Sequence, residues 1–207
     1  MSKKPIIVFE GIEGSGKSFH INNVINYLKK RNKKFIKIRE PGGNKNSEKI
    51  RKLILNNKSS FNSNTDLLLY LSARSENIDL LRKNRNKKII LIDRFVDSTI
   101  AYQHYGMGVD LKFIEESNKF LLKDIKISFT FLNLVNQKNM KIRLAMRKKL
   151  NRYDKFTSSF YTKVQEGFLK ISRKNPKKYM KIDSNKDISE NKRIILNKID
   201  KLISVSY

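Results

Sequence analysis

The stretch Ile6-Ile-Val-Phe-Glu10, followed directly by Gly11-Ile-Glu-Gly-Ser-Gly-Lys-Ser18, is the most informative part of this sequence about its fold. It matches the P-loop pattern G-x-x-x-x-G-K-[ST], in which glycines let several backbone N–H groups turn toward one phosphate. Lys17 suits the β- and γ-phosphates of a nucleotide, and Ser18 offers a hydroxyl to Mg²⁺. A glycine-rich turn before an ordinary helix is the alternative. The motif predicts ATP contacts from Gly11, Glu13, Gly14, Ser15, Gly16, Lys17 and Ser18.

The P-loop stands in the context that the motif requires, between a strand and a helix. Residues 5–10 form a short apolar run, and the apolar side chains within residues 17–30 fall on one helical face. Further strands are predicted at 34–39, 89–92, 127–134 and 179–182, and helices at 47–56, 65–82 and 110–122. Asp110 is the predicted cap of its helix, and Asp187 with Glu190 has the form of a capping box that opens a last helix.

This alternation predicts an α/β fold of the P-loop NTPase type, with a five-stranded parallel sheet and helices on both faces. No repeat or flexible linker divides the chain, so residues 1–207 are expected to form one domain. The region 140–172 reads as helical and basic, with an interruption near Asn151, and it is a candidate for a mobile cover.

Composition excludes several classes of protein. The chain has no cysteine, so disulfides, thiolate metal sites and thiol nucleophiles are ruled out. No apolar stretch approaches the roughly 20 residues of a membrane span, and the N-terminus lacks the features of a signal peptide. We therefore expect a cytoplasmic protein with no membrane partner.

The excess of positive charge has two interpretations. The chain carries 46 Lys and Arg against 19 Asp and Glu, a formal charge of +27. One interpretation is a nucleic-acid-binding protein, which should keep useful affinity at physiological salt. The other is a compositional bias, because the basic residues are spread along the whole chain and alanine occurs only at Ala73, Ala101 and Ala145. The even spread favours the bias, and no specific nucleic-acid partner is expected.

Asp93 follows the third predicted strand, where a P-loop protein places an acid near its metal ion. An aspartate that only forms a turn is the alternative. A GTPase would carry an Asn-Lys-x-Asp segment, which is not found here. The sequence thus argues against a GTPase, and it favours Ser18 and Asp93 on the metal side.

Five segments together resemble thymidylate kinases, in order, in approximate spacing and over nearly the whole chain. They are Phe9–Ser18, Arg39-Glu-Pro-Gly-Gly43, Tyr70-Leu-Ser-Ala-Arg74, Asp93-Arg-Phe95 and Ser98-Thr-Ile-Ala-Tyr-Gln103. The resemblance implies phosphoryl transfer from ATP to dTMP with Mg²⁺, for dTTP synthesis, by a homodimer. Related nucleotide or deoxynucleoside kinases are the nearest alternative. Arg39 and Arg94, which suit an acceptor phosphate, argue against a nucleoside as the acceptor.

The resemblance also implies roles for single residues. Glu13 would accept a hydrogen bond from the deoxyribose 3′-hydroxyl, and Arg39 and Arg94 would hold the acceptor phosphate. Tyr102 would face the 2′ position of the sugar and exclude ribose. The base would lie against four residues, with Tyr70 stacking on it and Arg74 donating to a carbonyl. These four residues are Tyr70, Arg74, Thr99 and Gln103.

The segment 140–155 resembles the lid of bacterial thymidylate kinases, which carries the catalytic arginine. Arg143, Arg147 and Arg152 match its basic positions, and Asp154 matches an acidic one. Arg143 and Arg147 lie four residues apart, so a continuous helix would place them on a similar face. Either can be the main lid arginine, and the predicted catalytic residues are Lys17, Arg94, Arg143 and Arg147.

Three positions depart from the family pattern. Phe19 stands where a second hydroxyl residue often follows the P-loop, and Asn44 replaces a threonine. Met107 replaces an arginine between Gly106 and Gly108, which puts any phosphate or interface contact at that position in doubt.

Overall fold

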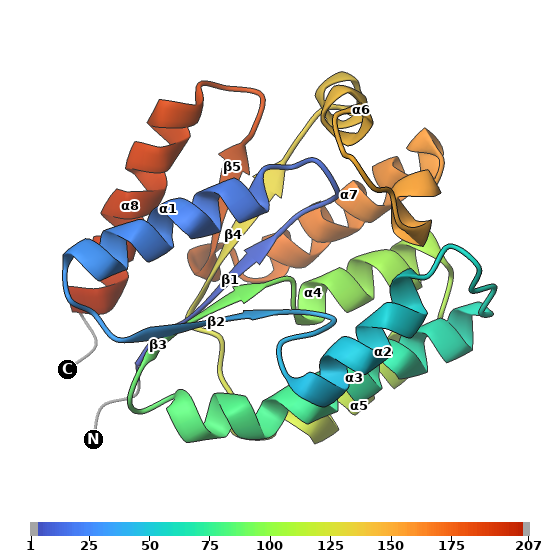
Figure 1. Cartoon of the computed structure of the whole chain (residues 1–207), viewed down its shortest axis with the longest axis horizontal. Helices are drawn as coiled ribbons and strands as arrows, with labels where there is room; N and C mark the ends of the chain where they lie inside the picture. Colours follow the sequence, from blue (N-terminus) through green and yellow to red (C-terminus); the bar gives the residue numbers. More distant parts are fainter. Residues whose placement is uncertain (1–3, 205–207) are drawn as a thin grey trace.

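A computed structural model describes residues 4–204 and contains a five-stranded parallel sheet with the order β2-β3-β1-β4-β5 (Figure 1). All four pairs of neighbouring strands run parallel. The predicted fold class is confirmed, and each strand lies within two residues of its predicted bounds. The strands are β1 (Ile6–Glu10), β2 (Phe35–Arg39), β3 (Ile89–Asp93), β4 (Phe129–Leu134) and β5 (Tyr179–Asp183).

Helices connect the strands and cover both faces of the sheet (Figure 1). The α-helices are α1 (Lys17–Lys30), α2 (Lys45–Leu55), α3 (Ser63–Asn84), α4 (Val96–Thr99), α5 (Leu111–Leu122), α6 (Gln137–Ala145), α7 (Ser158–Lys174) and α8 (Ile188–Ser204). The shorter elements are the π-helix η1 (Ile100–Gly106) and the 3₁₀-helices η2 (Arg152–Lys155) and η3 (Pro176–Lys178). The sequence predicted no element at 96–106, where α4 continues into η1.

The central strand β1 shows how the two layers form. Ile7 and Phe9 pack in one apolar cluster with residues of α1 and α8, whereas Ile6 and Val8 pack in another with residues of α3. Successive side chains of a strand point to opposite faces, so a fully apolar strand serves both layers. Figure 1 shows α1 and α8 on one side of the sheet, with α3, α5 and α7 on the other.

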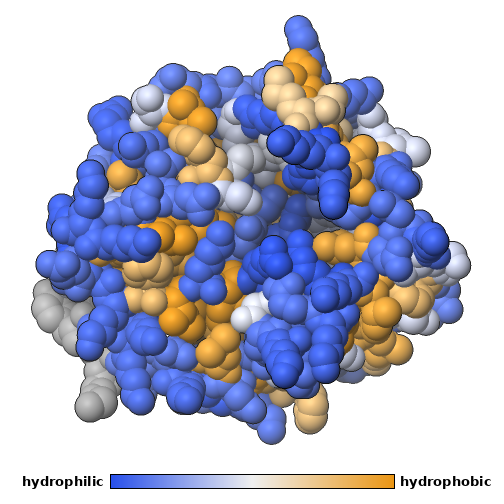
Figure 2. Space-filling model, viewed as in Figure 1, coloured by the Kyte–Doolittle hydropathy of each residue, from blue (hydrophilic) through white to orange (hydrophobic). Residues whose placement is uncertain are grey.

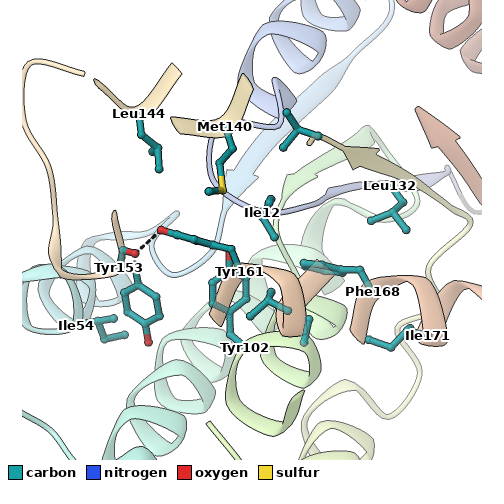
Figure 3. Close-up of a cluster of buried hydrophobic side chains, with 13 residues drawn as sticks. Ile12, Ile54, Tyr102, Leu132, Met140, Leu144, Tyr153, Tyr161, Phe168 and Ile171 are labelled. Carbon is teal, nitrogen blue, oxygen red and sulfur yellow. Dashed lines mark hydrogen bonds between the residues drawn. The ribbon is translucent and has the colours of Figure 1, made fainter. Parts of the chain in front are cut away.

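A third cluster joins α7 and η1 to the segment that follows α6 (Figure 3). Tyr102, Tyr153 and Phe168 are buried in it, and the Tyr161 hydroxyl donates to the backbone carbonyl of Tyr153 at 2.5 Å. Met140 brings α6 into the same cluster. The region predicted as a cover therefore rests on a packed aromatic core.

The break in this region is wider than the sequence analysis predicted. Helix α6 ends at Ala145 and the next α-helix begins at Ser158, with only η2 between them. Asn151 and Asp154 form a capping box that starts η2. Arg147 therefore lies beyond the end of α6, and the expectation that it shares a helix face with Arg143 is wrong.

Two predicted caps are present. Asp110 accepts a hydrogen bond from the backbone N–H of Phe113, and Asp187 accepts from those of Ser189 and Glu190. Between residues 4 and 204, none of the helices combines the length and the apolar character that a membrane crossing requires.

Candidate active site

The P-loop connects the end of β1 to the start of α1. Gly11 has φ +136°, and a Cβ atom there would lie 2.2 Å from the carbonyl oxygen of Asn133, so this position requires glycine. The Lys17 ammonium donates to the carbonyl oxygens of Gly11 at 2.9 Å and Ile12 at 2.8 Å. Burial, and next the charge of Arg94, lowers the pKa of Lys17 to about 7. A bound phosphate would favour the charged form of this lysine.

An outer cavity lies at the carboxyl ends of the strands, beside the P-loop. Figure 2 shows a hollow on this face below α6, walled by hydrophilic residues. Ser18 and Asp93 face each other in the cavity, with 3.4 Å between Oγ and Oδ2. The charged residues that line it are Glu13, Lys17, Arg39, Glu40, Arg51, Asp93, Arg94 and Arg147. Five cations against three carboxylates make this cavity suited to phosphate groups.

Arg94 directly follows β3, and its side chain contacts the P-loop. Its guanidinium donates to Glu13 at 2.7 Å and to the carbonyl oxygen of Gly11 at 2.8 Å. Burial alone would lower the pKa of Arg94, but the nearby groups Glu13, Tyr102, Asp93 and Glu10 together outweigh burial and hold that pKa above its usual range, with Glu13 contributing most. Glu13 is 9% exposed, so it is not a solvated acid of a surface loop.

The Glu10 carboxylate binds the backbone and a side chain just after Arg94 and so stabilises the conformation of this segment. Arg94 has φ +65°, a conformation that costs energy for a residue other than glycine. Glu10 accepts hydrogen bonds from the backbone N–H of Phe95 at 2.7 Å and from the Ser98 hydroxyl at 2.5 Å. Ser98 in turn accepts from Arg94 at 3.3 Å. Burial, and next the charge of Asp97, raises the pKa of Glu10 to about 7.

An inner pocket continues from the outer cavity toward the interior. Tyr70 and Arg74, which lie four residues apart on α3 and so share a helix face, reach it together, and so do Thr99 and Gln103. Further lining comes from Glu13, Glu40, Arg94, Phe95, Ser98, Tyr102 and Tyr153. Because Glu13 and Arg94 line both spaces, they mark the boundary between the inner pocket and the outer cavity.

Arg74 is 1% exposed and is held by three partners. Its guanidinium donates to Glu40 at 2.8 Å, to Asn118 at 2.6 Å and to the Thr99 hydroxyl at 2.9 Å. Burial raises the pKa of Glu40, and Arg74 opposes that shift. A guanidinium has five N–H donors, so this network orients Arg74 and leaves donors for a ligand.

The arginines of the lid region have different surroundings. Arg147 pairs with Asp154 and lines the outer cavity. Arg143 donates to the carbonyl oxygens of Gly14 at 2.9 Å and Ser184 at 2.6 Å, on the other side of the P-loop. Arg152 pairs with Asp66 of α3. Of the three, only Arg147 faces the cavity that holds Lys17.

A side pocket lies beyond the P-loop, next to Arg143. Its lining consists of Gly16, Phe19, His20, Arg143, Ser184, Lys186, Ile188 and Asn191. Phe19, which departs from the family pattern, is 44% exposed here. The pocket thus offers an aromatic ring and a planar guanidinium beside the first turn of α1.

The other two departures have structural explanations. The Asn44 side chain caps α2 by accepting from the backbone N–H groups of Asn46 and Ser47 at 3.0 and 2.9 Å. Met107 is partly buried against two apolar clusters, so it has a packing role.

Arg39, predicted to bind the acceptor phosphate, also lines the outer cavity. Its guanidinium faces the Glu48 carboxylate at 2.9 Å.

Sequence reasoning missed several residues that shape the site. Glu40 stands inside the quoted Arg-Glu-Pro-Gly-Gly segment, and that position was the available signal. Arg51, which donates to the carbonyl oxygen of Pro41 at 2.5 Å, is one of many basic residues and had no distinguishing signal. Tyr153 follows Arg152 in the lid segment, but its place in the inner pocket depends on chain folding.

Ser18 and Asp93 form the candidate magnesium site. In the stretch 4–204, no group of three or more His, Cys, Asp and Glu side chains is placed to hold a metal ion. Mg²⁺ commonly takes one or two protein oxygens and completes its shell with phosphates and water. A hydroxyl and a carboxylate beside a phosphate cavity therefore fit this ion.

Comparison with known proteins shows the family to which the chain belongs. The family model described as "Thymidylate kinase" matches residues 9–195. A thymidylate kinase of Sulfurihydrogenibium sp. is 36% identical over 199 residues, covering 93% of this chain and 95% of the relative. One of Mycoplasma capricolum is 36% identical over 191 residues, covering 89% of each chain. The crystal structure of thymidylate kinase from Ehrlichia chaffeensis superimposes with a TM-score of 0.76 at 30% identity, covering 95% of this chain and 98% of that one.

Proposed function

The chain belongs to the thymidylate kinase family, and from that premise we infer that it transfers the γ-phosphoryl group of ATP to dTMP. It is a phosphotransferase with a phosphate group as acceptor, and its products are ADP and dTDP, the precursor of dTTP. We place this step of nucleotide synthesis in the cytoplasm. The observation that carries the assignment is the inner pocket, which opens toward a cationic cavity beside the P-loop.

The inner pocket is proposed to hold the thymine and the sugar. Tyr70 supplies an aromatic face, and Arg74 has free N–H donors for a base carbonyl. Thr99 and Gln103 complete the contacts to the base. Tyr102 and Glu13 stand on the side that leads to the outer cavity, where the sugar would lie.

The outer cavity is proposed to hold the phosphates of both substrates. Arg94 and Arg39 would bind the acceptor phosphate, and Lys17 with the P-loop amides would bind the β- and γ-phosphates of ATP. The attacking phosphate oxygen is already anionic, so no general base is needed. Catalysis then consists of alignment and charge neutralisation by residues of this chain.

Ser18 and Asp93 are proposed to hold Mg²⁺, with Ser18 as a direct ligand. When bound, the ion neutralises charge on the donor phosphates and orients them. Both side chains line the outer cavity together with Lys17 of the P-loop, which supports this proposal.

Residues 140–155 are proposed to act as the lid, with Arg147 as the lid arginine. Arg147 already lines the outer cavity, whereas Arg143 is bound to the carbonyl oxygens of Gly14 and Ser184. Arg143 is better suited to bind the adenine of ATP. It lines the side pocket with Phe19, where the purine would lie against the guanidinium plane.

A homodimer is proposed on the face formed by α3 and α5. Leu68, Phe113 and Phe120 are 51%, 46% and 70% exposed and line one apolar groove. An apolar face of this kind on a nucleotide-binding enzyme is suited to a two-fold contact between copies. Sedimentation of the wild type and of Phe120→Glu tests this, because only the wild type should be dimeric.

A coupled ADP-release assay across nucleoside monophosphates tests the reaction. We expect dTMP to be the best substrate and thymidine to be inactive. The rate with dUMP should be lower, because one lost methyl contact is worth about 1–3 kcal/mol. A higher kcat/KM for AMP, or for thymidine, than for dTMP would show that the assignment of the acceptor is wrong.

A further inference from the structure

Gln103 presents one end of its side-chain amide to Tyr153, while the other end lacks a partner. Its Nε2 donates to the Tyr153 hydroxyl at 3.3 Å. Its Oε1 is buried and accepts no hydrogen bond from any residue between 4 and 204. Buried polar atoms are nearly always paired, so an unpaired acceptor in a residue that lines the inner pocket points to a ligand with a donor.

The orientation of the Gln103 amide follows from the residues behind it. The Tyr153 hydroxyl donates to one carboxylate oxygen of Asp66, and Arg152 donates to the other. A carboxylate paired with an arginine only accepts hydrogen bonds, so the single hydroxyl proton of Tyr153 is committed to Asp66. Toward Gln103 the hydroxyl oxygen can only accept. The NH₂ group must therefore face Tyr153, and Oε1 must face away from it.

We propose that Asp66 is a positioning residue that sets the base specificity of the inner pocket through Tyr153 and Gln103. The chain of hydrogen bonds leaves Gln103 Oε1 as an acceptor that faces the base. This acceptor matches the N3–H donor of thymine or uracil. The N3 atom of cytosine is itself an acceptor and would face Oε1 without a proton between them. This inference rests on the proposed function, because it assumes that the base lies against Gln103.

The position of Asp66 makes the role indirect. Asp66 is 1% exposed in the first turns of α3 and is not among the residues that line the inner pocket. It reaches the base through two side chains from distant segments, with 87 residues separating it from Tyr153 and 50 separating Tyr153 from Gln103. If Asp66 had a purely structural role, anchoring η2 through Arg152, its substitution would lower kcat/KM by the same factor for every substrate.

The ratio of kcat/KM for dTMP to kcat/KM for dCMP, measured by ADP release, distinguishes the two roles. In Asp66→Asn the amide can donate to Tyr153, which frees the hydroxyl proton for Gln103 Oε1 and turns NH₂ toward the base. We expect the ratio to fall about ten- to hundred-fold, the usual effect of one mismatched buried hydrogen bond. Tyr153→Phe keeps the ring and the Asp66–Arg152 pair but removes the relay, so the ratio should fall there as well.

Arg152→Lys is the matched control, because it keeps a cation beside Asp66 and leaves the hydroxyl proton in place; its ratio should stay near that of the wild type. Equal losses for dTMP and dCMP in Asp66→Asn would overturn the proposal and leave Asp66 as an anchor. A fall in Asp66→Asn without one in Tyr153→Phe would also overturn it, since the effect would bypass the hydroxyl. Failure of the proposed function is separable, because the wild type itself would then not prefer dTMP.

Discussion

The hydroxyl of Tyr102 donates a hydrogen bond to the Glu13 carboxylate, which joins the π-helix η1 to the P-loop. The same carboxylate pairs with Arg94 at 2.7 Å, and the Arg94 guanidinium lies 5.1 Å from the centre of the Tyr102 ring. The three side chains form one unit at the boundary between the inner pocket and the outer cavity. A π-helix inserts an extra residue in a turn and is frequent at functional sites.

The first prediction concerns the proposed exclusion of ribose. Tyr102→Ala removes the ring from the position proposed to face the 2′ carbon, so kcat/KM for ribo-TMP relative to dTMP should rise. Tyr102→Phe keeps the ring and removes only the hydrogen bond to Glu13, so it should retain the wild-type preference. Both ratios come from the ADP-release assay. An unchanged ratio in a folded Tyr102→Ala variant would remove Tyr102 from this role.

The second prediction separates the two lid arginines. Arg147→Met keeps an unbranched stem and removes the guanidinium, so packing should survive. An arginine that stabilises phosphoryl transfer is worth on the order of 10³–10⁵ in kcat, and we expect a fall of that size with little change in KM for dTMP. Arg143→Met should mainly raise KM for ATP, because Arg143 lines the side pocket. The opposite pattern would move the catalytic role to Arg143, and normal kcat in both would exclude a lid arginine.

The third prediction concerns the metal ion. Removal of Mg²⁺ with EDTA should abolish ADP release, and added Mg²⁺ should restore it. Asp93→Asn should raise the Mg²⁺ concentration needed for half-maximal activity, since a neutral amide attracts the cation less than a carboxylate. Asp79→Asn, at an exposed acid on α3, serves as the control. If Asp93→Asn shows the wild-type requirement for Mg²⁺, Asp93 does not act on the metal side.

The fourth prediction concerns stability and pH. The pKa of Glu10 rises from 4.5 to about 7 in the folded protein, first because of burial and next because of Asp97. The folded state therefore binds this proton more tightly than the unfolded state, and the stabilisation is present below pH 4.5 and lost as the pH rises through 7. Glu10→Gln cannot ionise, so its free energy of unfolding relative to the wild type should increase between pH 5 and 8.

Urea unfolding of both proteins at each pH measures this difference, which should amount to a few kcal/mol at about 1.4 kcal/mol per pKa unit. Other groups change the stability in the opposite direction. Burial lowers the pKa of His20 to about 4 and that of Lys17 to about 7, so both add stability as the pH rises. Both are present in each protein and largely cancel in the comparison. A difference that stays constant with pH would contradict the prediction.

Much of the fold could be read from local patterns. The P-loop glycines, the apolar run of β1 and the helical period of α1 are each properties of neighbouring residues, and the bounds predicted from them are correct to within one residue. Residues 100–106 were missed because a π-helix follows neither the period of a strand nor that of an α-helix, and the four residues of α4 before them are too few to show a period. The end of α6 was misjudged because basic, apolar and polar residues continue past Ala145 without a proline or glycine to mark the stop.

Local sequence patterns are sufficient for the strand–P-loop–helix unit, the parallel α/β architecture and the residue types available for binding phosphate. The pairs of side chains that come into contact depend on the packing of the elements: Arg94 meets Glu13 across 81 residues, Arg74 meets Glu40 across 34, and Asp66 meets Tyr153 across 87. This difference arises because a helical or strand period, like a turn, reflects interactions between neighbours along the chain. The direction of a hydrogen bond between distant side chains depends on how the elements pack, and a one-dimensional pattern does not contain that information.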